Sequence, residues 1–188
     1  DLMLTPSAVK LPVDSALHRT VSRDPLLGPL LSAVMDDSVA VSVSDAQLPG
    51  LPLVMVNKAF EELTGYTADE VIGLNCRFLQ CAQTEPKAVT AIIDAMRAQE
   101  RCEVRITNQR KDGSLFINLL TMQPVLDAIT GTTRFVVATQ RAETTARLAG
   151  AEARDYAEAI FAAIPRSVTF SVKALRRPTA ATTRAELD

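Results

Sequence analysis

Histidine is almost absent from this 188-residue chain, which contains only His18, and tryptophan is missing altogether. Zinc sites and Ser-His-Asp or Cys-His catalysis commonly use imidazole groups, and a single histidine leaves almost none for either class of site. The three cysteines, Cys76, Cys81 and Cys102, are too few and too irregularly spaced for a disulfide framework. We therefore expect no metal centre, no histidine-dependent nucleophile, and a reducing, cytoplasmic compartment.

Strong charge and long apolar runs are also lacking. The formal net charge is −2, which gives no electrostatic reason to expect a nucleic acid or an anionic membrane as a partner. No apolar run approaches the length of a membrane span, and the first residues lack the basic start and apolar block of a secretory signal. With 47% hydrophobic and 22% charged residues, the composition is that of a soluble globular domain with extensions. Because the sequence starts at Asp1 rather than at methionine, the natural start is left open.

Hydrophobic periodicity predicts two strands, several short helices and then a three-stranded meander. The expected strands cover 39–43, 53–56, 102–108, 116–122 and 134–140; short helices follow Thr67, whose spacing from Glu70 is that of a capping box, and Thr84. This order is typical of the α+β class, with a five-stranded antiparallel sheet and short helices on one face.

The chain divides by composition around this core. We expect a flexible lead-in over 1–23, a cap helix over 24–36, the core over 37–140, a helix over 141–164 and a partly disordered extension over 165–188. The helix 141–164 carries an alanine-rich seam at heptad spacing, interrupted by Gly150. Packing on the chain's own sheet and pairing in a coiled coil both remain open for it.

Carboxamides occupy positions in the meander where a core is expected. Asn108 shares the parity of Cys102, Val104 and Ile106, and Asn118 that of Phe116, Leu120 and Met122, so an odd-length loop makes them neighbours on one buried face. A buried carboxamide without partners costs roughly 1–3 kcal/mol. The amides can satisfy each other or bond to the backbone. For two amides on adjacent strands, with Asn75 and Gln80 elsewhere, a bound polar heterocycle becomes more plausible, and Gln140 at the end of the third strand can add another amide. A ring edge that alternates N–H and C=O, such as that of a flavin, suits amides.

The stretch GLNCRFLQ, residues 73–80, places Cys76 between Asn75 and Arg77. The cysteine alone has four readings: a small buried hydrophobe, a metal ligand, a nucleophile, or a group that reacts with a bound molecule. The scarcity of histidine weakens the metal and nucleophile readings.

GLNCRFLQ resembles the signature of light-oxygen-voltage (LOV) domains, the flavin-binding blue-light sensors of the PAS superfamily. The resemblance continues upstream through VNKAFEELTGYTADEVIG and downstream through RITNQRKDGSLFINLL and FVVATQ, so that it covers about 39–140. It implies a PAS-like fold whose flanking helices pack on the sheet or on a second protomer.

The same resemblance implies the role of each site residue. Cys76 is expected to form a reversible bond with flavin carbon C4a after blue-light excitation. The other implied contacts are those of Asn108 and Asn118 with the polar ring edge, Asn75 and Gln80 with the ribityl chain or nearby polar groups, Arg77 with the phosphate, and Gln140 near flavin N5. Because light creates the reactive state, a protonated thiol suffices and no neighbouring base is required.

One departure from the family concerns the cofactor. Ile93 stands where many members carry a second phosphate-binding arginine. FMN is the expected cofactor, with FAD and riboflavin as alternatives. Cys81, at a site often taken by glycine, is read together with Cys102 as a small hydrophobe.

The resemblance implies a short LOV photoreceptor rather than an enzyme. The sequence shows no second domain of the length of a kinase and no helix-turn-helix, so output is expected through a homodimer of flanking helices or an unidentified protein partner. A flavin- or thiol-dependent oxidoreductase is one rival, although no nicotinamide site or CxxC pair is visible. A PAS module that senses redox state or a ligand without photochemistry is the other.

Overall fold

The computed structural model describes residues 38–143, 155 and 158–168. Its elements are β1 (Ala40–Asp45), β2 (Leu53–Val56), α3 (Lys58–Thr64), α4 (Ala68–Val71), the 3-10 helix η1 (Cys76–Leu79), α5 (Pro86–Ala98), β3 (Cys102–Gln109), β4 (Leu115–Asp127), β5 (Thr133–Ala142) and β6 (Ser167–Val168). Residues 158–163 form a further helical segment. The predicted lead-in 1–23 and cap helix 24–36 lie outside the described residues.

The strands form one sheet in the order β2-β1-β5-β4-β3, with every neighbouring pair antiparallel. The predicted α+β class and the antiparallel five-stranded sheet are confirmed. The sheet also has a sixth member, because the two-residue β6 pairs parallel with β4. This parallel pairing brings the C-terminal segment back beside the end of β4, where Leu126 N donates to the carbonyl of Arg166 at 2.9 Å.

The hairpin of β3 and β4 has a loop of five residues, 110–114, between the paired Gln109 and Leu115. Gly113 lies at φ 86, a left-handed conformation that a residue with a Cβ rarely adopts. Asp112 Oδ1 accepts from the N–H of Ser114 at 2.9 Å, as aspartates in tight turns often do. The odd loop length puts Asn108 directly across from Phe116, so the inner residues of both strands share one face.

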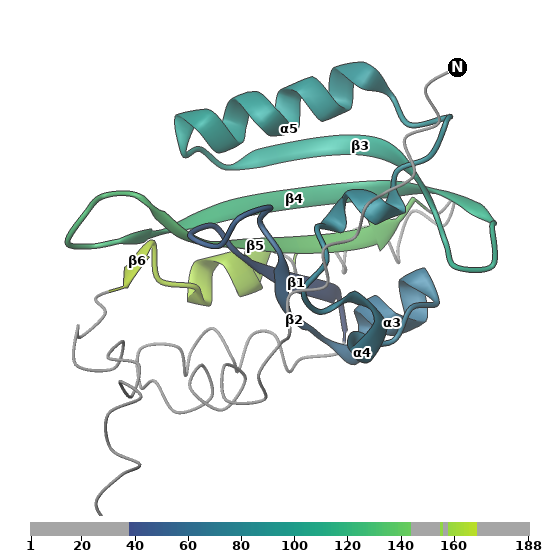
Figure 1. The fold of residues 1–188 in the computed structure, drawn as a ribbon, viewed down its shortest axis with the longest axis horizontal. Coiled ribbons are helices and arrows are strands. Elements are labelled where there is room, and N and C mark those ends of the chain that lie inside the picture. The colour runs from purple at the N-terminus through teal and green to yellow at the C-terminus, as the bar shows by residue number, and fades with distance from the viewer. Residues whose placement is uncertain (1–37, 144–154, 156–157, 169–188) are drawn as a thin grey trace, which may run out of the picture.

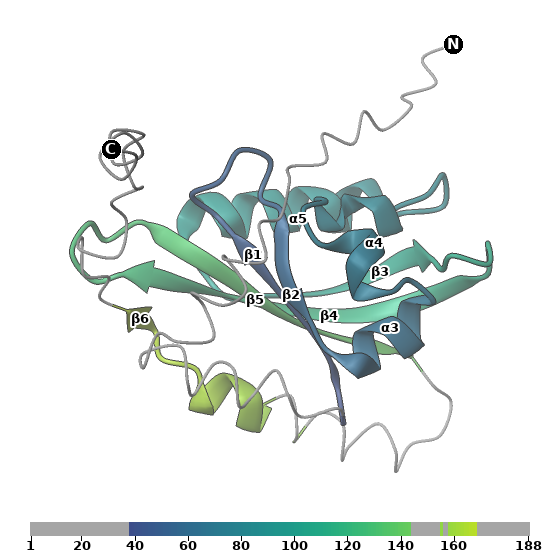
Figure 2. The same cartoon turned by 60° about the horizontal axis from the view of Figure 1, so that its bottom comes forward.

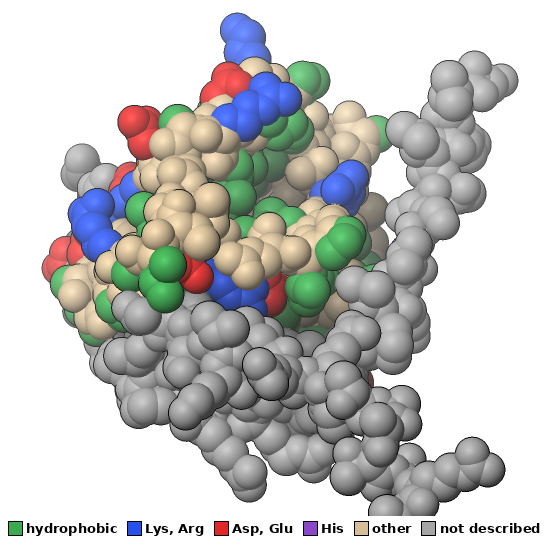
Figure 3. All heavy atoms as spheres, turned by 60° about the vertical axis from the view of Figure 1, so that its left-hand side comes forward, with side chains coloured by type: hydrophobic (Ala, Val, Ile, Leu, Met, Phe, Trp, Pro, Cys, Tyr) green, Lys and Arg blue, Asp and Glu red, His purple; other side chains and the backbone are tan. Residues whose placement is uncertain are grey.

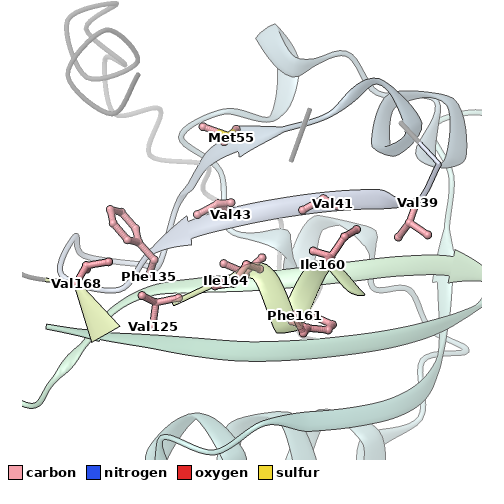
Figure 4. Packing of buried hydrophobic residues seen from close by; sticks show 11 residues of the cluster. Val39, Val41, Val43, Met55, Val125, Phe135, Ile160, Phe161, Ile164 and Val168 are labelled. Atoms are coloured by element: carbon pink, nitrogen blue, oxygen red, sulfur yellow. The ribbon is translucent and has the colours of Figure 1, made fainter. Parts of the chain in front are cut away.

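The two faces of the sheet are covered by different parts of the chain, as Figures 1 and 2 show with α5 and the helical segment 158–163 on opposite sides. We call the face that carries Ala40, Ser42, Asn108, Asn118 and Gln140 the inner face; α3, α4, η1 and α5 lie on it. The outer face carries the alternating residues of the same strands. There the apolar residues form one buried cluster: Val39, Val41, Val43, Met55, Val125, Phe135, Val137, Ile160, Phe161, Ile164 and Val168 (Figure 4).

Side chains at the helix starts tie the helices to the sheet. Asn57 caps α3, because its Oδ1 accepts from Phe60 N at 3.0 Å, and the same oxygen accepts from Val41 N on β1 at 2.8 Å. The predicted pair of Thr67 and Glu70 is confirmed at α4, where Thr67 N donates to Glu70 Oε2 at 3.0 Å. These caps hold the short helices against the edge of the inner face.

The predicted cap of α5 by Thr84 is wrong by one residue, since Glu85 occupies the N-cap position and Pro86 begins the helix. Thr84 instead donates to the carbonyl of Thr107 at 2.7 Å. The Glu85 carboxylate accepts from Thr107 N at 2.7 Å and from its hydroxyl at 2.8 Å. The start of α5 is therefore fixed to β3 rather than closed by a local cap.

The strand β5 continues through Ala142, so it includes the first two residues of the C-terminal helix predicted to start at Arg141. Pairing with β4 explains this, because Leu119 and Asn118 lie opposite Arg141 and Ala142. Within the described part of 141–164, Ile160, Phe161 and Ile164 pack on the chain's own sheet, one of the two arrangements that the sequence left open.

Candidate functional site

Two carboxamides face each other on the inner face. Asn108 on β3 and Asn118 on β4 keep only 4% and 1% of their surface exposed, and Asn118 Nδ2 donates to Asn108 Oδ1 at 2.9 Å. The prediction that they are neighbours on one buried face is confirmed. Their mutual bond leaves Asn118 Oδ1 buried without a hydrogen-bond donor among the described residues. A buried acceptor in this state is destabilising, and it points to a donor from a bound molecule.

Gln140 shows the same pattern on the neighbouring strand β5. It is 1% exposed, and its Nε2 donates to the hydroxyl of Ser42 on β1 at 2.7 Å. Its Oε1, like Asn118 Oδ1, is buried and accepts no bond from any residue that the structure describes. Leu120 of β4 pairs directly with Gln140 in the sheet, two residues along the strand from Asn118. The two unpartnered oxygens therefore belong to adjacent strands and to the same face.

The thiol of Cys76 opens η1 on that face. Burial raises the pKa of Cys76 to about 12, while a hydrogen bond with Ser42 acts in the opposite direction without offsetting it. Cys76 is half-buried and packs against the cluster of Leu53, Phe60 and Leu79. The thiol is thus neutral at ordinary pH and poorly suited to attack a ground-state electrophile.

Local sequence explains why Cys76 points inward. Gly73, at φ 87, turns the chain after α4, and its N–H donates to the carbonyl of Leu53 at 2.8 Å. Asn75 then caps η1, since its Oδ1 accepts from Arg77 N at 2.9 Å, and its Nδ2 donates to the carbonyl of Gly50 at 2.6 Å. Both ends of the Asn75 side chain thus hold the loop before Cys76 in place.

The remaining predicted site residues lie at the rim. Arg77 and Gln80 are exposed, so the structure does not bring them into the buried group of Asn108, Asn118 and Gln140. Ile93, where an arginine is common, is 43% exposed on α5. The roles of Asn75, Arg77 and Gln80 toward a cofactor chain stay predictions.

The helix α5 closes the inner face incompletely. None of its residues is fully buried, although Val89, Ile92 and Met96 repeat at helical spacing and are half-buried. An open groove of about 870 Å³ lies between the start of α5 and β3, lined by Gln83, Thr84, Glu85, Lys87, Val104 and Arg105 among others. On the side shown in Figure 3, hydrophobic side chains lie at the bottom of a hollow that polar and charged side chains surround. The helix α5 thus leaves the inner face of the sheet incompletely covered.

These features fit a flavin. A planar ring can fill apolar space between a helix and a sheet, and its polar edge carries the N–H donor that an unpartnered amide oxygen requires. Sequence reasoning missed Ser42, whose hydroxyl accepts a hydrogen bond from Gln140 Nε2. The sequence did contain a sign of this position, because the alternation of Val39, Val41 and Val43 places Ser42 on the opposite face of the strand.

Two negative findings apply to the described residues. No three or more His, Cys, Asp or Glu side chains are grouped so that they could hold a metal ion. No helix among them has the length and apolar character to cross a membrane.

Comparison with known proteins gives consistent matches. The model of the PAS domain family matches residues 37–144. The chain is 37% identical over 107 residues to a protein of Listeria innocua named blue-light photoreceptor. This match covers 57% of this chain and 42% of that protein. It is 42% identical over 97 residues to a blue-light-activated histidine kinase of Brucella anthropi, covering 52% of this chain and 20% of the kinase. The chain therefore spans less than half the length of these relatives.

Solved structures agree. A LOV domain from the blue-light activated histidine kinase of Erythrobacter litoralis is 38% identical, with a TM-score of 0.54, and the match covers 57% of this chain and 97% of that domain. A LOV protein of Rhodobacter sphaeroides is 28% identical, with a TM-score of 0.67, over 75% of this chain and 82% of that protein.

Proposed function

Because the chain belongs to the PAS domain family and, within it, to the LOV domains, we propose that it is a blue-light receptor that binds a flavin. The observation that carries the proposal is the meeting of three features on the inner face. Asn118 and Gln140 bury unpartnered oxygens, burial raises the pKa of the Cys76 thiol so that it is neutral, and α5, which lies on the same face, has no fully buried residue. The similarity to proteins named blue-light photoreceptor and blue-light-activated histidine kinase supports the same function.

Asn108 and Asn118 would hold the polar edge of the flavin ring. Their mutual hydrogen bond fixes both amides, so that Asn118 Oδ1 is oriented before the ligand arrives. A site organised in advance loses less conformational entropy on binding. Gln140 would contact the ring from β5 through its free Oε1.

Cys76 would be the light-reactive residue. A bound flavin would supply, under blue light, the electrophilic carbon C4a for reversible addition of the neutral Cys76 thiol and the nitrogen N5 as the acceptor of the thiol proton. The high pKa of Cys76 keeps that proton on the sulfur in the dark.

FMN is the proposed flavin, and its phosphate would lie near Arg77 at the rim. Arg77 is exposed and Ile93 offers no charge, so the phosphate contributes less to affinity here than where two arginines hold it. Riboflavin is accordingly expected to bind only slightly more weakly than FMN.

The signal would leave through β5 to the C-terminal segment. Gln140 lies three residues before Glu143, which pairs with Arg105 at 2.7 Å. The segment 158–168 then covers the outer face of the same strand. We propose that the state of Cys76 shifts the packing of this segment between two populations, which a homodimer or a protein partner senses.

The experiment compares the absorption of purified protein in the dark and under blue light, for the native chain and for Cys76→Ala. The flavin band of the native protein is expected to bleach and to recover in the dark, and the variant is expected to keep the flavin without bleaching. A variant that bleaches and recovers like the native protein contradicts the role of Cys76. A protein that binds flavin but never bleaches is a ligand or redox module rather than a light receptor.

A further inference from the structure

The turn between β3 and β4, residues 110–114, lies against the end of α3. Arg110 Nε donates to the carbonyl of Leu63 at 2.8 Å, and Lys111 N donates to the carbonyl of Thr64 at 3.0 Å. The last carbonyls of a helix have no partner within the helix and carry the negative end of its dipole. The turn therefore supplies hydrogen-bond donors, and Arg110 a positive charge, to the end of α3.

The side chain of Arg110 also reaches the inner face. Its guanidinium carbon lies 4.4 Å from the ring centre of Phe116, which is a cation–π distance. Phe116 lies directly opposite Asn108 in the hairpin and two residues before Asn118 on β4, with all three residues on one face. The Phe116 residue is only 7% exposed, and the guanidinium over its ring contributes to that burial. Arg110 thus covers the aromatic side chain that borders both amides.

The Arg110 side chain contacts three parts of the protein at once, because the turn itself is the third. Its Nη1 donates to the hydroxyl of Ser114 at 3.3 Å, and the main-chain N–H of Arg110 donates to the Ser114 carbonyl at 2.8 Å. A guanidinium suits this place, since it has five donors in one plane and a flat face that stacks on an aromatic ring. Arg110 is half-buried, whereas the next residue, Lys111, is exposed and pairs with Glu70 at the surface.

The contacts of Arg110 connect two walls of the candidate site. One wall is the hairpin with Asn108 and Asn118, and the other includes α3, whose Phe60 packs in the same cluster as Cys76. We propose that Arg110 is a positioning residue that fastens these walls together and thereby slows the release of the flavin, an inference that rests on the proposed light-receptor function. When the turn separates from α3, water reaches the amides and competes for their hydrogen bonds, so the ligand leaves sooner.

The first test measures the rate at which FMN leaves the protein in the dark, from the recovery of FMN fluorescence after dilution. Arg110→Gln removes the charge and the stacking on Phe116, so the rate is expected to rise about tenfold. Arg110→Lys keeps the charge and one donor and is expected to raise the rate only about twofold.

Two controls separate this role from general effects of substitution. Lys111→Gln removes the exposed pair with Glu70 in the same turn but keeps the main-chain bond to Thr64, so the rate is expected to change less than about twofold. Phe135→Leu weakens the outer cluster and is expected to lower stability without changing the rate of FMN release. A rate that rises equally in Phe135→Leu and Arg110→Gln would mean a general loss of stability and would overturn the proposal.

The second test reads the side-chain amide of Asn118 by nitrogen-15 NMR, with the signal assigned by Asn118→Leu. Arg110→Gln is expected to shift this signal and to speed exchange of the amide protons about fivefold, and Arg110→Lys to restore most of the native signal. Equal Asn118 signals and equal FMN release in the native protein, Arg110→Gln and Lys111→Gln would overturn the proposal even if the native protein bleaches normally. An Asn118 signal that follows Arg110 in a protein that binds FMN but does not bleach would support the positioning role and reject the light-receptor function.

Discussion

The two faces of the sheet are built from the same strands but differ in how completely the protein's own side chains pack against them. On the outer face, Val41, Phe135 and Val137 pack with Ile160 and Ile164 into a cluster that the chain closes by itself. On the inner face, the alternating residues of those strands include amides with unpartnered oxygens, and α5 above them buries no residue fully. This difference is what we expect if the outer face serves stability and, as we propose, a flavin completes the inner face.

The outer face is expected to give the largest loss of stability. Phe135 is 2% exposed in the outer cluster, so Phe135→Ala should lower the free energy of unfolding by about 3–5 kcal/mol. Denaturant titration measures the loss, with Phe135→Leu as a milder companion. The spectrum of bound flavin should be almost unchanged in Phe135→Leu. A loss below about 1 kcal/mol for Phe135→Ala would mean that this cluster is not the main core.

The burial of Cys76 on the inner face should make the stability of the protein depend on pH in the alkaline range. The pKa of Cys76 rises from 9.0 to about 12 on folding, so the folded state favours the protonated thiol. The contribution of this pKa shift to the free energy of unfolding is fully present below pH 9. It is lost as the pH rises from about 9 toward 12, at a slope of about 1.4 kcal/mol per pH unit. Unfolding midpoints against pH for the native protein and Cys76→Ala measure it. Parallel profiles for the two proteins would contradict an enclosed thiol.

Asn118→Leu separates ligand binding from folding. The variant loses a contact to the flavin and should bind FMN about ten- to a hundredfold more weakly. The free energy of unfolding without flavin should change by less than about 1 kcal/mol, because the variant removes one unpartnered oxygen, Asn118 Oδ1, and frees another, Asn108 Oδ1. Thr121→Val, on the opposite face of the same strand, is the control. Equal affinity in both variants would remove Asn118 from the site.

The smallest effect is expected where the outer face meets the C-terminal segment. Arg101 pairs with Glu158 at 3.1 Å and lies 4.8 Å from the ring centre of Phe161. Arg101→Ala should speed hydrogen exchange at Ile164 about two- to fivefold, since half-exposed ion pairs and cation–π contacts contribute about 0.5–1 kcal/mol. Arg105→Ala is the control, because Arg105 pairs with Glu143 instead. Unchanged exchange in both would show that Arg101 does not hold the segment.

The sequence predicted those features that depend on local patterns. Strand alternation and an odd hairpin loop were sufficient to bring Asn108 and Asn118 together, as the 2.9 Å contact between them confirms. Strand ends depend on distant partners, so the continuation of β5 to Ala142 beside β4 and the pairing of β6 with β4 could not be derived from those residues alone.

In the candidate site, too, local patterns were predicted from the sequence and contacts between distant residues were not. Gln140 was expected to add an amide at the end of the third strand, but its hydrogen-bond partner Ser42 lies 98 residues away in the sequence, so this contact emerged only in three dimensions. Thr84 looked like a helix cap by spacing, yet its hydroxyl is used by the carbonyl of Thr107. Side chains with several partners to choose from are placed by tertiary packing, which local propensity does not describe.

The central claim is that a flavin completes the inner face, and titration of the flavin-free protein with FMN tests it most directly. Quenching of FMN fluorescence should saturate at one flavin per chain, and the bound form should unfold at a higher temperature, since a ligand that binds only the folded state stabilises it. Fluorescence that falls without saturation, with no rise in the unfolding temperature, would contradict the account.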